Sequence, residues 1–196
     1  MKSLVLLLKV KNMPNPFYKD VLFEDEELLE KMFLYFESLD WKQDTYIIHG
    51  KTVQPKRKTF MYGKDYSYSG QTQSSIPFDR QITYISRKIE EKLNLKRGYF
   101  NGCLLNFYED GKSYISYHRD NEEQMVDDAI IVSLGLGATR KFYLKNDESK
   151  DVEKLIHNQG EILVMEALTQ KEWTHSVPKE AGVKDIRISL TFRRFK

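Results

Sequence analysis

Two segments of the chain carry apolar residues at helical spacing. In residues 23–39 apolar side chains recur every three to four positions, and the acidic residues Glu24–Glu27 lie where the positive end of a helix dipole favours them. A second apolar stripe follows Pro77, a typical start signal, and consists of Ile82, Ile85, Ile89 and Leu93. Both patterns predict amphipathic helices that cover a sheet.

From about residue 100 the hydrophobic period changes to two, which is the pattern of half-buried β-strands. Seven such runs, separated by turn signals such as EDGK and KNDES, cover residues 103–109, 114–120, 129–136, 141–146, 161–167, 174–179 and 187–195. Short strands at this spacing predict a mostly β sandwich, jelly roll or barrel. We favour a jelly roll with helices packed on one face. The apolar run Leu4–Leu8 predicts a further buried strand.

Composition narrows the class of protein. A chain of 196 residues with 40% hydrophobic residues fits one domain with a sizeable core and excludes a disordered or fibrous chain. No apolar run approaches the roughly 18 residues of a membrane span, and Leu4–Leu8 is too short for a signal peptide. The single cysteine, Cys103, excludes an intrachain disulfide and a four-cysteine metal site. We therefore expect an intracellular protein with no membrane association.

The charge distribution says more than the net charge of +2. Residues 51–64, KTVQPKRKTFMYGK, carry five basic residues, Arg57 among them, and no acidic one, and the tyrosine-rich YSYSGQTQSS follows. Basic residues interleaved with aromatic ones suit a phosphate backbone beside stacking bases. On charge alone, a solvated surface loop is the alternative.

Three residues are candidates for a metal site. His118 and Asp120 are two positions apart in YISYHRD, so on a strand both side chains would leave the same face. His175, in EWTHSVP, begins another predicted strand. Two imidazoles and a carboxylate on one face of an octahedron form the triad of non-haem Fe(II) oxygenases, which leaves positions open for an organic chelate and O₂. The alternative is a surface His–Asp pair with an unrelated His175.

The C-terminal run RISLTFRRF adds a candidate carboxylate site. Its polar residues share one face of the strand and its apolar residues the other; the polar set is Arg187, Ser189, Thr191 and Arg193. Buried arginines need anionic partners, and a guanidinium matches a carboxylate bidentately. A dicarboxylate that bridges the metal and an arginine would satisfy both ends of such a site. Asn106 and Tyr108, two apart in LLNFYE, are further donors.

Four segments in this order and spacing, within residues 47–195, resemble AlkB-type Fe(II)/2-oxoglutarate-dependent dioxygenases, especially the eukaryotic-type DNA alkylation repair members. They are NFYEDGKSYISYHRDNE, SLGLGATRKFYL, GEILVMEALTQKEWTHSVP and RISLTFRRF. The resemblance implies a double-stranded β-helix, or jelly roll, with N-terminal helices and a nucleotide-recognition lid. It implies one domain over residues 1–196, with an N-terminal strand and helix in 1–45, the lid in 46–76 and the jelly-roll core in 100–196.

The resemblance also implies roles for individual residues. His118, Asp120 and His175 match the iron ligands of the family. Arg187 matches the arginine that pairs with the distal carboxylate of 2-oxoglutarate, and Arg193 matches the one near its metal-bound end. The supporting polar contacts to this cosubstrate match Asn106, Tyr108 and Thr191. The family commonly carries asparagine where this chain has Ser189.

Contacts to the nucleic acid follow from the same resemblance. Tyr68 matches an aromatic residue that stacks on the damaged base, Tyr66 a tyrosine that hydrogen-bonds near it, and Glu122 an acidic residue that faces it. In IIHGK, His49 stands where duplex-repairing relatives place an apolar wedge at a hairpin tip. Because imidazole is small and polar, we expect a weak wedge and a preference for single strands. A surface histidine without a role is the alternative.

The implied activity is a direct-reversal DNA repair reaction, the oxidative dealkylation of N-methylated bases of the 1-methyladenine and 3-methylcytosine type. Fe(II) and O₂ oxidise 2-oxoglutarate to succinate and CO₂, the N-alkyl carbon is hydroxylated, and formaldehyde is lost. The implied partner is single- or double-stranded DNA, and we expect a monomer in the nucleus or cytoplasm. Two alternatives remain: the same chemistry on RNA or a protein side chain, and a catalytically inactive jelly-roll binding module.

Overall fold

The computed structural model describes residues 15–43, 45–48, 51–68 and 71–196. The predicted strand Leu4–Leu8 lies outside the described residues. None of the helices in the described part of the chain has the length and hydropathy of a membrane span.

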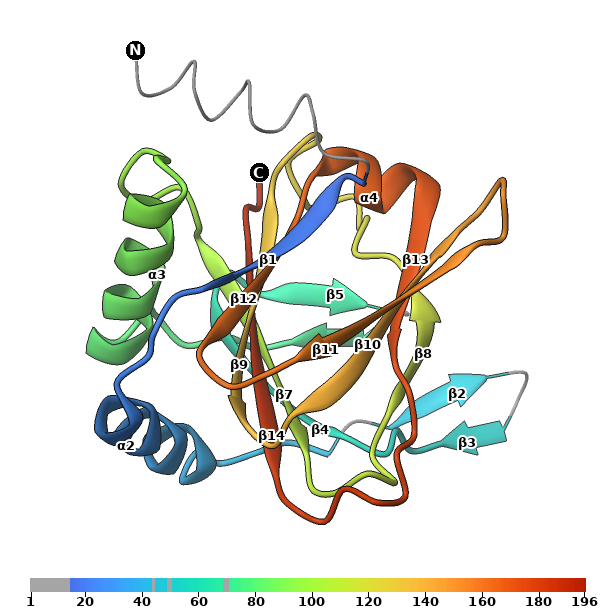
Figure 1. Ribbon diagram of the computed structural model, residues 1–196, viewed down its shortest axis with the longest axis horizontal. Coiled ribbons are helices and arrows are strands. Elements are labelled where there is room, and N and C mark those ends of the chain that lie inside the picture. Colours follow the sequence, from blue (N-terminus) through green and yellow to red (C-terminus); the bar gives the residue numbers. More distant parts are fainter. Residues whose placement is uncertain (1–14, 44, 49–50, 69–70) are drawn as a thin grey trace.

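Two antiparallel sheets face each other (Figure 1). The larger has six strands in the order β1 (Phe17–Val21), β12 (Glu161–Met165), β9 (Ile131–Gly137), β14 (Arg187–Arg193), β7 (Gly102–Tyr108) and β4 (Lys58–Gly63). The smaller has four, in the order β11 (Val152–His157), β10 (Arg140–Asn146), β13 (Trp173–Val177) and β8 (Ile115–His118). Strands β7 to β14 are divided equally between the sheets, β1 and β4 extend the larger one, and the predicted jelly roll is confirmed.

Two helices, α2 (Glu26–Glu37) and α3 (Arg80–Lys92), lie on one side of the sheets (Figure 1). Each begins after an aspartate whose carboxylate accepts a backbone N–H of the first turn: Asp25 from Leu28 at 3.0 Å and Asp79 from Ile82 at 2.9 Å. The predicted stripe of α3, with Ile82, Ile85 and Ile89, is fully buried. It packs with the apolar residues of one face of the larger sheet, so the helices cover that face as predicted.

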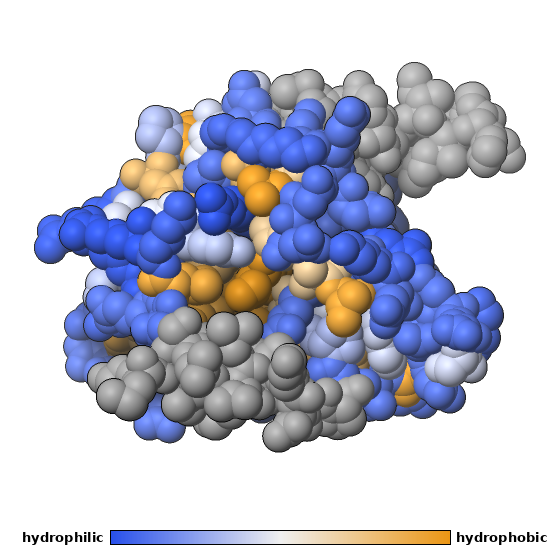
Figure 2. All heavy atoms as spheres, turned by 90° about the horizontal axis from the view of Figure 1, so that it is seen from above, coloured by the Kyte–Doolittle hydropathy of each residue, from blue (hydrophilic) through white to orange (hydrophobic). Residues whose placement is uncertain are grey.

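The other face of the larger sheet encloses a second core against the smaller sheet. Strand β7 shows the division, because Cys103 and Leu105 join the cluster under the helices while Leu104 joins the cluster between the sheets. Side chains that alternate along a strand serve opposite faces. In the view of Figure 2 the surface is mostly hydrophilic, and hydrophobic side chains show at the floor of a central hollow.

Several elements differ from the sequence prediction. The pattern did not predict β1, β4 or β11; in β11, VEKLIH, apolar residues do not alternate and most side chains are exposed. Residues 46–76, expected to form a lid, include β4, which pairs with β7 in the larger sheet. The rest of that stretch contains two hairpins, β2 (Tyr46–Ile48) with β3 (Lys51–Val53) and β5 (Tyr66–Tyr68) with β6 (Gln71–Gln73). The predicted strand 161–167 ends at Met165, and α4 (Ala167–Glu172) follows.

The packing of α2 predicts a contrast between two of its residues. Phe36 is fully buried, whereas Leu34 is 54% exposed. Phe36→Ala should lower the free energy of unfolding by about 3–5 kcal/mol, because it removes a buried ring and leaves a cavity. Leu34→Ala should change it by less than about 0.5 kcal/mol. Urea unfolding measures both, and equal losses would contradict this packing.

Candidate metal centre

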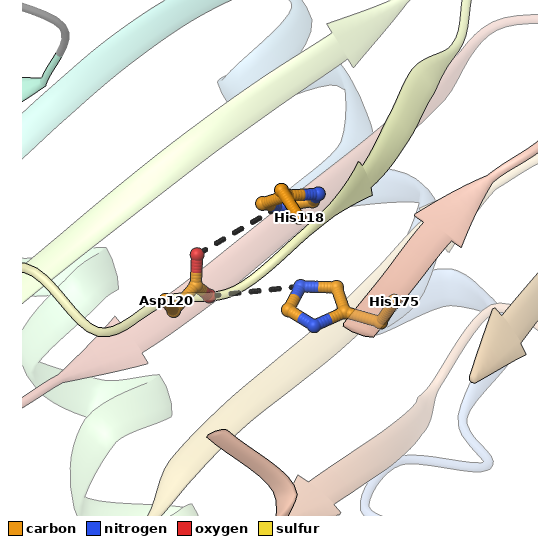
Figure 3. Close-up of side chains that lie close together, drawn as sticks. All are labelled: His118, Asp120 and His175. Carbon is orange, nitrogen blue, oxygen red and sulfur yellow. Dashed lines mark ion pairs between the residues drawn. The ribbon is translucent and has the colours of Figure 1, made fainter. Parts of the chain in front are cut away.

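Two histidines and an aspartate, residue types that can bind a metal, lie together between the two sheets (Figure 3). His118 is the last residue of β8 and stands opposite His175 of the neighbouring strand β13. The Asp120 carboxylate lies beside both rings, 3.7 Å from Nε2 of His118 and 3.9 Å from Nε2 of His175. One ligand atom from each residue lies within 4.8 Å of the others. The structure therefore brings together the three residues that the sequence predicted.

Asp120 reaches this position differently from the expectation. The predicted strand 114–120 ends at His118, so Asp120 lies in the irregular segment that follows. Its side chain is held instead by Arg193, whose guanidinium lies 2.8 Å from Oδ1. His118 and Asp120 therefore lie close together as predicted, but not because they share one face of a strand.

The two histidines present nitrogen lone pairs. Nδ1 of His118 lies 2.9 Å from the carbonyl of Ser116, and only a protonated nitrogen can donate there, so Nε2 is left free to bind a metal. Burial lowers the pKa of His118, and burial together with the neighbouring His118 lowers the pKa of His175 to about 3. Both imidazoles are therefore neutral at physiological pH, the form that coordinates a metal.

Asp120 supplies the negative charge of the site. Burial alone would raise its pKa, but the adjacent Arg193 and the two histidines favour the ionised form, and the pKa is lowered overall. Two neutral imidazoles and one carboxylate, from adjacent segments, form a donor set that suits Fe(II) and leaves coordination positions open. The residues present thus fit a divalent iron ion.

The polar face of β14 lines the same pocket as the triad. Arg187, Ser189, Thr191 and Arg193 of β14 lie there with Asn106 and Tyr108 of β7. Arg187 is 2% exposed, and its Nη1 donates to the carbonyls of Ala138 and His157, at 3.0 Å each. Burial lowers its pKa to about 10, so it remains charged at neutral pH. A Cβ at Gly135 would lie 2.0 Å from Nη2 of Arg187, so only glycine leaves room for this guanidinium.

The predicted substrate contacts are placed in part. Arg57 and Glu122 line the pocket, and Nε of Arg57 donates to Oδ1 of Asn106 at 2.7 Å. Tyr66 and Tyr68 belong to strand β5, but their side chains are outside the description. His49 lies outside the described residues altogether. The stacking, hydrogen-bonding and wedge roles of these three residues stay predictions.

Sequence reasoning missed Arg140, the first residue of β10. It is 2% exposed and donates to the carbonyls of Asp110, Ser113 and Pro178, and its Nε lies 3.3 Å from Glu180. It thus joins the β7–β8 connection to the segment after β13 at one end of the pocket. In RKFYLKN it shares a face with two buried apolar residues, Phe142 and Leu144, and a charge on an apolar face was the available signal.

Comparisons with known proteins agree with this site. Residues 14–193 match the model of the 2OG-Fe(II) oxygenase superfamily. The chain is 34% identical over 183 residues to rat alpha-ketoglutarate-dependent dioxygenase alkB homolog 3, covering 88% of this chain and 60% of that protein. It is 30% identical over 186 residues to human DNA oxidative demethylase ALKBH2, covering 89% of this chain and 68% of that protein.

A solved structure shares the fold. The structure of OsALKBH1 superposes with a TM-score of 0.68 at 16% identity, covering 93% of this chain and 99% of that one. At this identity the likeness concerns the fold alone. The chain spans 60% of the length of the rat relative.

Arg140 and Lys141 both contact Glu180, but only Arg140 is buried, so their replacement should change the free energy of unfolding unequally. Arg140→Met should lower the free energy of unfolding by about 3–5 kcal/mol, because it removes the buried donor to the carbonyls of Ser113 and Pro178 and the buried charge beside Glu180. Lys141 lies 3.7 Å from the same carboxylate but is 48% exposed, so Lys141→Met should cost no more than about 1 kcal/mol. Urea denaturation of the metal-free protein measures both. A small loss in Arg140→Met would show that this network does not support the pocket.

Proposed function

Because this chain belongs to the 2OG-Fe(II) oxygenase superfamily, we propose that it removes methyl groups oxidatively from N-methylated bases in DNA, with Fe(II), O₂ and 2-oxoglutarate. The observation that carries the proposal is the joint placement of the triad and the buried, charged Arg187 in one pocket. The similarity to relatives named DNA oxidative demethylase supports the choice of substrate. We propose further that residues 1–196 act as a single AlkB-like domain.

In this proposal His118, Asp120 and His175 hold the iron. When bound, the metal supplies with O₂ the oxidation of the N-methyl carbon, coupled to the conversion of 2-oxoglutarate to succinate and CO₂. The neutral imidazoles offer lone pairs, and Asp120 offers a carboxylate that Arg193 keeps ionised. Three protein ligands would leave other coordination positions of the metal free, where the cosubstrate could bind.

The cosubstrate is held at its other end by Arg187, whose fork suits the distal carboxylate. Asn106, Tyr108 and Thr191 supply further polar contacts, and Arg193 lies near the metal-bound end. Nη1 of Arg187 is already fixed by two carbonyls, which orients the guanidinium before the ligand arrives. Such a fixed cation in a buried position favours an anionic ligand over a neutral one.

The base enters beside the triad. Glu122 and Arg57 line the pocket there. We assign Tyr68 to stacking on the damaged base and Tyr66 to a hydrogen bond near it. We assign His49 to the gap that the flipped base leaves in the duplex stack. A base in a duplex must first be flipped out, which costs a few kcal/mol, and methylation at a pairing nitrogen lowers that cost. The same N-methylated bases can occur in RNA, so methylated RNA is tested beside methylated DNA.

The first test measures turnover. With Fe(II), 2-oxoglutarate and a methylated DNA oligonucleotide, the protein should release succinate and formaldehyde and restore the base, as measured by mass spectrometry. His118→Ala and His175→Ala should abolish this turnover while the circular dichroism spectrum is retained, because each removes a proposed metal ligand. Leu34→Ala, at an exposed position, serves as the control. Full activity in either histidine variant would contradict the triad, and activity on methylated RNA alone would contradict the DNA substrate.

The second test concerns the cosubstrate. Arg187→Ala would leave a carboxylate unpaired in a buried pocket, at a cost of about 2–5 kcal/mol, so the KM for 2-oxoglutarate should rise well over tenfold. The matched control is Arg194→Ala. Arg194 follows β14 but is not among the residues that line the pocket. Its guanidinium carbon lies instead over the ring of Tyr99, 4.9 Å from the centroid. An unchanged KM in Arg187→Ala would rule out the assigned role.

A further inference from the structure

Asp120 is held by contacts with residues that are distant in the sequence, because it is not part of a strand. It lies two residues beyond the end of β8, and the last paired residue of that strand is His118. The residue is nevertheless 4% exposed, so its backbone N–H needs a partner that the sheet does not supply. Arg193 restrains the carboxylate but leaves the backbone of this segment to other contacts.

Gln170 of α4 supplies that partner. Its Oε1 accepts a hydrogen bond from the backbone N–H of Asp120 at 2.9 Å, and the side chain is buried, with 8% of the residue exposed. The other end of the amide, Nε2, contacts Sδ of Met165 at 3.7 Å. Because an N–H cannot accept from another N–H, this arrangement directs the amide oxygen, and not the nitrogen, toward Asp120.

The helix that carries Gln170 is firmly anchored. The hydroxyl of Thr169 donates to the carbonyl of Pro16 at 2.6 Å, and the backbone N–H of Glu166 donates to the same carbonyl at 2.9 Å. At the other end, the carbonyl of Glu172 accepts from Asp147 at 2.8 Å. Strand β13, with His175, begins at the next residue. One short segment therefore fixes the backbone of one proposed metal ligand and carries another.

We propose that Gln170 is a positioning residue that sets the geometry of the metal site through the backbone amide of Asp120. The inference rests on the proposed function, because it concerns the same triad. Without the Gln170 oxygen, the buried N–H would be unpaired, and the segment would shift to reach another acceptor. A shift of the backbone would move the carboxylate relative to the two imidazoles. Outer contacts of this kind typically change metal affinity by about 10–100-fold.

The test uses metal binding and needs no turnover. Gln170→Leu removes the acceptor at similar size, and Lys171→Gln is the control at an exposed neighbouring position. The dissociation constant for Mn(II) is measured by electron paramagnetic resonance, and the visible absorption of bound Co(II) reports the coordination geometry. The melting temperature of the metal-free protein corrects each affinity for the folded fraction.

We expect Gln170→Leu to weaken Mn(II) binding by about tenfold or more and to alter the Co(II) spectrum in fully folded protein. Lys171→Gln should match the wild type in both affinity and spectrum. Wild-type affinity and spectrum in Gln170→Leu, or a loss explained by unfolding alone, would overturn the inference while the metal site stands. If the wild-type protein itself bound no metal, the proposed function would fail together with the inference.

Discussion

The ion pair between Arg193 and Asp120 is the contact on which the site depends. Its atoms lie 2.8 Å apart, and both side chains are almost fully buried. It connects β14, a central strand of the larger sheet, with the irregular segment that follows β8 of the smaller sheet. A charged group in such an environment is tolerated only when it is paired, so each residue fixes the other. The carboxylate therefore stays ionised beside two neutral imidazoles.

The position of β14 explains why a polar pocket can exist inside a stable fold. The strand lies between β7 and β9, and every residue in it is buried. Ile188, Leu190 and Phe192 join the core under the helices, which contributes the apolar burial. The backbone of β14 is paired with β7 on one side and with β9 on the other. The side chains of the opposite face are therefore not needed to hold the strand in place, and they can be arginines and hydroxyl groups. Stability and ligand binding thus use different faces of one strand.

Much of this arrangement could be predicted from local patterns. The α3 stripe is buried as its period indicated, and the alternation in RISLTFRRF placed Arg187 and Arg193 on the pocket side. The identity of the triad followed from residue types and from resemblance to a known family. The prediction failed where the hydrophobic pattern was weak. Strand β11 has no clean alternation, and β4 lies within the stretch that the family resemblance assigned to a lid.

The sequence by itself determined the periodic elements and the residues available for chemistry, because periodicity is a local property of the chain. Only the tertiary structure decided how these residues are held. Asp120 is fixed by Arg193 and Gln170, and Arg140 is fixed by carbonyls of the β7–β8 connection and of the segment after β13. These partners are far apart in the chain and leave no periodic signal. Buried polar groups must nevertheless be satisfied, and the fold alone determines which distant group satisfies each one.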